Sequence, residues 1–164
     1  MIYSLAQNSV CDNMYYTIDK ADLRSRIDQE VSHVADEAYG DNGASLYDSI
    51  VLTEKDKEEV DRFIDTAISA FVSREFDICK YFYQTDSSTL ASEEMLEFYV
   101  PDLDETMIPT INEEISKYVT LFVCSCIFQT RRPSVVPQYT ERTQSSMNRA
   151  VTLLKSRKSP IKIW

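Results

Sequence analysis

Apolar residues recur at spacings of three and four over residues 110–130, the longest helical pattern in the chain. That spacing gathers them on one broad stripe of an α-helix. The stripe consists of Ile111, Ile115, Tyr118, Val119, Phe122, Val123, Cys126 and Ile127. Thr110 followed by Glu113 is typical of a capping box at a helix start. Pro133 predicts the end of the helix, because proline disfavours helical geometry in the residue before it. A helix this apolar is predicted to lie at the centre of the fold.

Residues 19–39 show the same periodicity and predict the first helix. Asp19 precedes the pattern and is a residue type that favours helix N-caps. Gly40 follows it, where a left-handed C-terminal cap is expected. The single histidine, His33, lies beside the apolar stripe and is interpreted as a partly buried helix residue rather than a metal ligand. The segment before this helix, residues 1–16, shows no periodicity and is expected to be irregular.

Two more helices are predicted, one before and one after the central helix. Thr53 is expected to cap the earlier one, and part of its apolar stripe is expected to pack against the central helix. The two sets of packing residues are Phe63, Ile64, Ala67, Ile68 and Phe71 on the earlier helix, and Ile115, Val119, Phe122 and Val123 on the central one. The last helix is expected to begin at Ser134 or Val136, with Pro137 in its first turn, where a missing amide costs nothing.

Residues 80–101 have a different pattern, in which two runs of strand length flank a polar stretch. The runs are KYFYQT and MLEFYV, which are rich in aromatic and β-branched residues, and between them lies DSSTLASEE. This pattern predicts a β-hairpin with a long loop, or an extended arm. An isolated hairpin is marginally stable in water, so we expect it to lean on the helical body or on another subunit. The predicted fold is mainly α: a small four-helix bundle-like domain with a β-hairpin or extended arm between helices 2 and 3.

The length and composition of the chain fit one domain. Of its 164 residues 43% are hydrophobic and 27% are charged, which is typical of a globular rather than a disordered chain. We assign residues 1–158 to a single helical domain and residues 159–164 to a C-terminal docking tail. The tail alternates apolar and polar residues and ends in an indole, as expected of a segment that orders on binding a partner.

Charge is unevenly distributed along the sequence. The formal net charge is −10, but residues 131–164 hold eight basic residues and one acid, Glu141. This part therefore bears +7 and the remainder −17, which predicts an acidic body with a basic arm. The alternative is a solvated helix whose basic last turn suits the helix dipole. The residues predicted to bind a partner are Arg131, Arg132, Lys155, Arg157, Lys158, Ile161, Lys162, Ile163 and Trp164.

Candidate catalytic and metal sites are scarce. The chain has two glycines, which argues against a phosphate-cradling loop. Its four cysteines are not spaced as zinc ligands, and those on apolar stripes, Cys79 and Cys126, are interpreted as small buried hydrophobes. No apolar run approaches the roughly 18 residues that span a bilayer, and no basic leader opens the chain. We therefore expect no enzyme activity, no cofactor and no metal, and synthesis in a reducing cytoplasm.

Two stretches of the chain resemble a known family. The longer one is VTLFVCSCIFQTRRPSVVPQYTERTQSSMNRAVTLLKSRKSP, which is similar to the C-terminal half of the head–tail connector (adaptor or neck) proteins of long-tailed bacteriophages and prophages. In that pattern an apolar helix is followed by an Arg/Pro-containing loop and a second helix. The matching positions of the second helix are Tyr139, Val151, Leu153, Leu154 and Lys155. The other stretch, LTEKDKEEVDRFIDTAISAFVSREFD, resembles the first core helix of the family, so that the resemblance covers about half of the chain.

The resemblance implies a structural virion protein rather than an enzyme. Such proteins form a ring of about twelve copies beneath the portal, extend the DNA channel and dock the next neck or tail protein. The implied partners are further copies of the chain, the portal protein and a tail or neck completion protein, with no membrane. Genomic DNA is expected to pass through without specific binding, because an acidic lumen does not hold phosphates. The implied location is the neck of the virion, after synthesis in the cytoplasm of the bacterial host.

Two other classes of protein remain open. One is a helical interaction or nucleic-acid-binding module that uses the basic C-terminal region, although the acidity of the body opposes non-specific DNA affinity. The other is an enzyme or metal-dependent regulator, which the single histidine and the lack of Gly-rich loops oppose.

Overall fold

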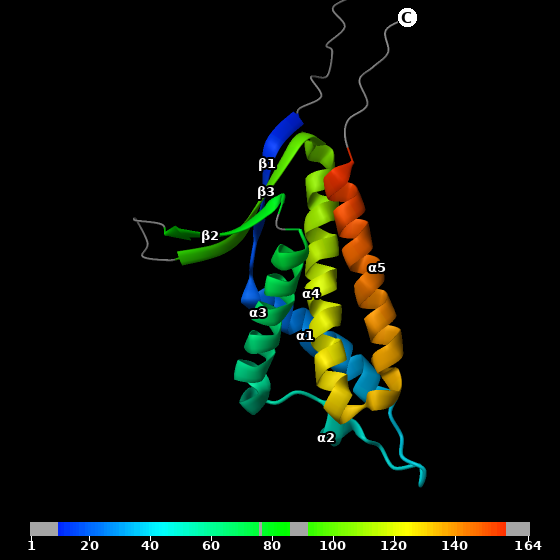
Figure 1. The fold of residues 1–164 in the computed structure, drawn as a ribbon. Helices are drawn as coiled ribbons and strands as arrows, with labels where there is room; N and C mark the ends of the chain where they lie inside the picture. Colours follow the sequence, from blue (N-terminus) through cyan, green and yellow to red (C-terminus); the bar gives the residue numbers. More distant parts are fainter. Residues whose placement is uncertain (1–9, 76, 86–91, 157–164) are drawn as a thin grey trace, which may run out of the picture.

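The computed structural model describes residues 10–75, 77–85 and 92–156, and this part of the chain folds as a helical body with a small sheet at one side (Figure 1). Its elements are β1 (Val10–Thr17), α1 (Lys20–Asp36), α2 (Tyr47–Ile50), α3 (Lys57–Arg74), β2 (Cys79–Thr85), β3 (Ser92–Asp104), α4 (Ile108–Arg131) and α5 (Val136–Lys155). The long helices α1, α3, α4 and α5 pack together, and the β2–β3 hairpin joins α3 to α4. The predicted mainly α, bundle-like fold with a hairpin between its second and third long helices is confirmed.

Helix α4 is the central helix, as predicted. It contacts α1, α3 and α5, and its residues Ile115, Val119 and Val123 have no exposed surface. It ends at Arg131, two residues before Pro133, also as predicted. Its start differs from the prediction, because Ile108 opens the helix and Thr110 already lies inside it.

The expected capping box at the start of α4 is wrong. A 3-10 turn precedes the helix, and Asp104 caps that turn by accepting from the amide of Thr106. Pro109 occupies the first turn of α4, where its missing amide needs no partner. Glu113 therefore does not cap the helix, and its carboxylate binds Arg26 of α1 instead.

Helix α3 packs on α4 through the predicted stripe, but the centre of the contact lies at Phe71. The Phe71 ring is buried and its centroid lies 5.5 Å from that of Tyr118. The hydroxyl of Tyr118 donates to the carbonyl of Ala67 at 3.2 Å. Phe63 and Phe122 are only partly buried, so they lie at the margin of the interface.

The sheet has three antiparallel strands in the order β1-β3-β2. The strand β1 corrects the expectation that residues 1–16 are irregular. Its residues alternate, so that Met14 and Tyr16 face the core while Asn13 and Tyr15 are exposed. Pairing of β1 with β3 shifts between Asn13 and Cys11, opposite Pro101 and Asp102 of β3. Pro101 has no amide to donate and Asp102 has a positive φ of 61°, as expected at a bulge.

The starts of the remaining long helices are set by residues close to them in the sequence. Asp19 caps α1 by accepting from the amides of Ala21 and Asp22 at 2.9 and 3.0 Å. The amide of Thr53 donates to Asp56 at 2.7 Å in the capping box of the turn before α3. Helix α5 begins at Val136 with Pro137 in its first turn. The starts of α1 and α5 were predicted, whereas Thr53 caps the turn before α3 and not α3 itself, which begins at Lys57.

Gly40 does not cap α1, contrary to expectation. The helix ends at Asp36 with Glu37 as its C-cap, and the chain then forms a turn in which the amide of Gly40 donates to the carbonyl of Ala44 at 2.8 Å. The positive φ falls at Gly43, at 75°, so the conformation that requires glycine lies three residues later than predicted.

Candidate functional site

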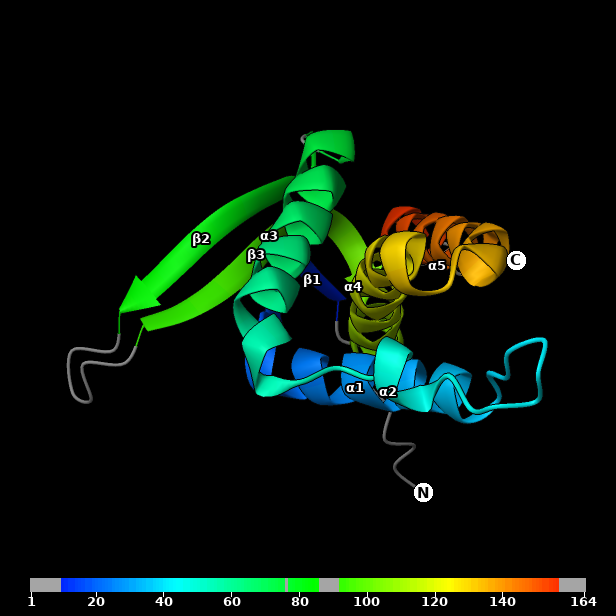
Figure 2. The ribbon, with the colours of Figure 1, turned by 90° about the horizontal axis from the view of Figure 1, so that it is seen from below.

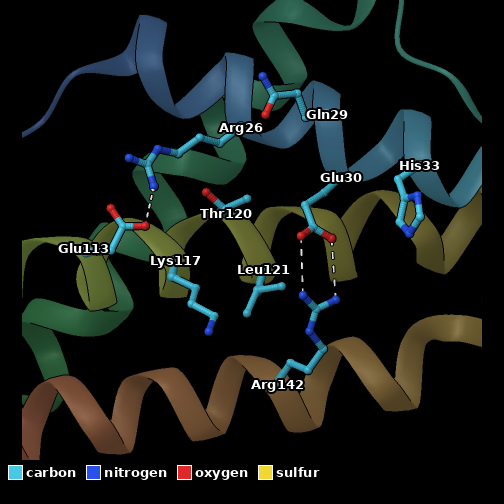
Figure 3. A pocket seen from close by; sticks show the side chains of 9 residues that line it. All are labelled: Arg26, Gln29, Glu30, His33, Glu113, Lys117, Thr120, Leu121 and Arg142. Carbon is cyan, nitrogen blue, oxygen red and sulfur yellow. Dashed lines mark hydrogen bonds and ion pairs between the residues drawn. The ribbon is translucent and has the colours of Figure 1, made fainter. Parts of the chain in front are cut away.

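A polar groove of about 430 Å³ lies between α1, α4 and α5 (Figure 3). Its residues on α1 and α4 are spaced by three or four positions, so one face of each helix is turned toward the groove. They are, together with one residue of α5, Arg26, Gln29, Glu30, His33, Glu113, Lys117, Thr120, Leu121 and Arg142. Thr120 and Leu121 are buried, whereas the charged side chains reach solvent, so the groove offers charged rather than apolar groups to its surroundings.

Two ion pairs join the helices around this groove. Arg26 donates to Glu113 at 2.8 Å and to Asp22 at 2.7 Å, and the hydrogen bond to Glu113 is the main cause that raises the pKa of Arg26. Arg142 faces Glu30 at 3.4 and 3.5 Å, which is long for a charge-assisted hydrogen bond. Burial is the largest effect and would lower the pKa of Arg142, but the charge and hydrogen bonds of Glu30, together with Tyr139, raise this pKa overall.

Lys117 lies between these two pairs and has no acidic partner within 4 Å among the residues that the structure describes. Its side chain extends from α4 toward α5 in Figure 3. The groove therefore has three cationic residues against two carboxylates, in a chain whose net charge is −10. Three other hollows on the described surface have more acidic than basic lining residues. The lining of the groove thus has one more cation than carboxylates, and Asp22, which also binds Arg26, lies outside this lining.

The sheet offers a second surface. On its outer face Tyr15 is 48% and Tyr99 59% exposed, and the hydroxyl of Tyr15 donates to Glu97 at 3.0 Å, which raises the pKa of Tyr15. In the described part of the chain β1 and β2 each pair only with β3, so each has one open edge. The β2–β3 hairpin extends away from the helices (Figure 2).

Two of the predicted partner-binding residues are bound inside the subunit. Arg131 donates to the carbonyls of Ile50 and Val51 at 3.2 and 2.7 Å and pairs with Asp56. Arg132 donates to the carbonyl of Val34 at 2.6 Å. These bonds fasten the end of α4 to α1 and to the segment before α3, so neither guanidinium can bind a partner without giving them up.

The other predicted residues fall into two groups. Lys155 lies 3.3 Å from Glu75, a carboxylate that is 7% exposed. The remaining ones, Arg157, Lys158, Ile161, Lys162, Ile163 and Trp164, lie outside the described residues. The proposed boundary between residues 1–158 and the tail at 159–164 falls there too.

The cations of α5 pair with acids of the body at intervals along the helix. Arg142 faces Glu30 of α1, and Arg149 lies 3.2 Å from Glu114 of α4. Glu114, like the partner of Lys155, is only 7% exposed. A buried carboxylate without a partner is strongly destabilising, so the basic face of α5 stabilises the fold of its own subunit.

The thiols in the described part of the chain are wholly or partly buried. Cys79 and Cys124 are free and buried, and Cys126 is partly buried. Burial raises the pKa of Cys79 to about 12, which keeps that thiol protonated at neutral pH. No three His, Cys, Asp or Glu side chains in the described ranges are placed to hold a metal ion. No helix within these ranges is long and apolar enough to cross a membrane.

Comparisons with known proteins provide no relative: no family model, curated protein or solved structure matches the chain.

The groove was not predicted from the sequence. Arg26, Glu30 and His33 recur at helical spacing on α1, which is the one signal available. Charged residues at that spacing usually mark a solvated face, and the outer face of α3 has the same pattern. Only the packing of α5 against α1 and α4 turns this face into a groove.

Proposed function

We propose that the protein is a structural subunit that assembles with copies of itself into a ring of the head–tail connector type. In this proposal the ring lies beneath the portal, extends the DNA channel and docks the next neck or tail protein. The resemblance of residues 119–160 to that family names the class. The structural observation that supports assembly is the β2–β3 hairpin, which extends beyond the helical body and has an open edge (Figures 1 and 2).

An open strand edge presents unpaired amides and carbonyls, which proteins protect unless another chain is to pair or pack there. The distal end of the hairpin, where residues 84 and 85 pair with 93 and 92, lies beyond the last residue of β1. A two-stranded ribbon is marginal in water by itself. Beside it, the exposed rings of Tyr15 and Tyr99 offer rigid contact area of the kind found in interfaces. These features favour a surface that another protein chain covers.

The contacts of the basic region favour assembly over the nucleic-acid-binding alternative. Five of the eight cations after residue 130 lie in the described ranges, and all five bind groups of their own chain. They are Arg131, Arg132, Arg142, Arg149 and Lys155. A surface whose cations are already paired gains little by releasing counterions from DNA. The acidity of the whole chain suits a channel through which DNA slides.

Sedimentation velocity and negative-stain microscopy of the purified chain test the proposal. We expect ring-shaped particles of about twelve copies, and weaker association at high ionic strength because salt screens charge pairs at an interface. A chain that stays monomeric at all concentrations would contradict the proposal. Salt-sensitive binding of duplex DNA by that monomer would support the nucleic-acid-binding alternative.

A further inference from the structure

We propose that neighbouring subunits meet by placing the acidic β2–β3 hairpin of one copy against the groove between α1, α4 and α5 of the next. This inference rests on the ring proposed above, and it names the two surfaces that form the contact.

The hairpin is strongly acidic. Its described part, residues 79–85 and 92–105, contains six acidic residues and one basic residue, Lys80. The acidic residues are Glu93, Glu94, Glu97, Asp102, Asp104 and Glu105. Because the hairpin extends away from the helices (Figure 2), it carries negative charge to a place that a second copy can reach.

The groove has the complementary charge. Lys117 has no acidic partner in the described ranges. It lies between Arg26 and Arg142, which both belong to ion pairs. The long contacts between Arg142 and Glu30 leave the Arg142 guanidinium able to share an incoming carboxylate. The other hollows compared have net negative linings and would repel the same hairpin. Charge therefore directs the hairpin to this groove.

The placement of the two surfaces suits a repeating contact. In Figure 2 the hairpin extends to one side of α4, and α5, which borders the groove, lies on the other side. A subunit can thus contribute its hairpin to one neighbour and receive the hairpin of another. Such head-to-tail contacts close into a ring when the rotation between subunits allows it.

A charge-swap experiment tests this contact by sedimentation velocity. The groove variant is Lys117→Glu, and the hairpin variant carries Glu93→Lys and Glu97→Lys. The matched control is Lys57→Glu, an exposed lysine on α3 outside the groove. Circular dichroism establishes that each variant is folded, and Lys117→Ala, which removes the charge without reversing it, serves as a milder second variant.

Each charge-reversed variant alone is expected to associate roughly tenfold more weakly than the wild type or more, because like charges then face each other. Lys117→Ala should give a smaller loss, and Lys57→Glu should associate as the wild type does. A one-to-one mixture of the groove and hairpin variants should recover association, because each reversed surface then meets an opposite charge.

Assembly of Lys117→Glu as strong as that of Lys57→Glu, or a mixture that fails to recover, would overturn the groove contact while leaving the ring intact. A monomeric wild type would overturn the ring and, with it, this contact.

Discussion

Phe71 and Phe122 belong to the same predicted interface but differ in their surroundings. Phe71 has no exposed surface and packs on two rings, with its centroid 6.0 Å from Phe98 in an edge-on contact and 5.5 Å from Tyr118. Phe122 is only partly buried, and its ring lies 6.0 Å from Tyr118. The cavity left by truncation would therefore be closed at Phe71 and open to solvent at Phe122.

Replacing Phe71 by Ala is expected to lower the free energy of unfolding by about 3–5 kcal/mol, the usual range for a buried phenylalanine. Phe122→Ala should cost less, roughly 1–2 kcal/mol, since less apolar surface is lost. Urea unfolding of both variants, followed by circular dichroism, measures the difference. Equal losses at the two positions would mean that α3 and α4 meet nearer to Phe122 than the structure shows.

Single residues were predictable where their role depends on near neighbours in the sequence. Asp19, Thr53 and Pro137 act at helix starts through groups within three positions, and their residue types indicate that role. Thr110 and Gly40 are residue types that favour helix caps, but neither of them lies at a helix end. The helix that Thr110 was expected to cap starts earlier at Ile108, because a turn capped by Asp104 leads into it.

Among the elements, the end of α4 is joined to the rest of the body by Arg131. Its guanidinium bonds to the carbonyls of Ile50 and Val51 and to Asp56. Asp56 also accepts from the amide and hydroxyl of Thr53. One side chain thus holds α4 against the segment that starts α3, which makes this contact a determinant of stability rather than a free docking site.

Arg131→Met replaces the aliphatic stem of the side chain but removes the guanidinium and these bonds, and we expect it to lower the free energy of unfolding by about 2–4 kcal/mol. Arg62→Met on the exposed face of α3 is the matched control, with an expected change within about 0.5 kcal/mol. Urea unfolding of both variants at neutral pH provides the comparison.

The pH dependence of stability gives a second measure of the same contact. Burial alone would raise the pKa of Asp56, but hydrogen bonds from Thr53 and Arg131 lower it overall. A carboxyl group with a depressed pKa contributes stability above its unfolded value, about 3.9, and loses it as the pH falls through the folded value. The wild type should therefore lose stability below about pH 4, and Arg131→Met should lose less over the same interval. If Arg131→Met loses as much unfolding free energy below pH 4 as the wild type does, Arg131 does not act on the pKa of Asp56.

The elements were predicted unequally for a physical reason. In a helix of ten or more residues the three-and-four spacing of apolar residues repeats several times and can be recognised in the sequence. For this reason α1, α3, α4 and α5 were expected. The strand β1 has no neighbouring strand in sequence, and what defines it is pairing with β3, 78 to 94 residues away. Its alternation of Met14 and Tyr16 with Asn13 and Tyr15 is present in the sequence but covers only a few residues. The groove was missed on similar grounds, since it needs α1 to lie beside α4 and α5, from which α1 is more than 70 residues away in sequence.

At the scale of the molecule, the basic C-terminal region is divided between two roles. Sequence shows the charge of this region but not its partners, and the acids that bind Arg142, Arg149 and Lys155 lie on α1, on α4 and after α3. The part that ends at Lys155 therefore stabilises the subunit. Docking to a portal, which the resemblance implies, is left to the residues beyond α5.

Near the end of the described fold, Leu154 has no exposed surface and Lys155 pairs with Glu75. Deleting residues 160–164 removes neither contact, so the melting temperature should stay within about 2 °C of the wild type. Deleting residues 154–164 removes both and should lower it by roughly 10 °C, as expected for the loss of a buried leucine. Thermal melts followed by circular dichroism compare the two truncations.

The shorter truncation also separates the two proposed interfaces. Self-association through the hairpin and the groove should persist, because neither surface includes residues 160–164. Docking to the portal should weaken, because the tail supplies the apolar and basic residues predicted to bind there. If deletion of residues 160–164 unfolds the subunit, the tail belongs to its core and is not a docking segment. If the truncated chain instead stays folded but no longer forms rings, the tail rather than the hairpin carries the contact between subunits.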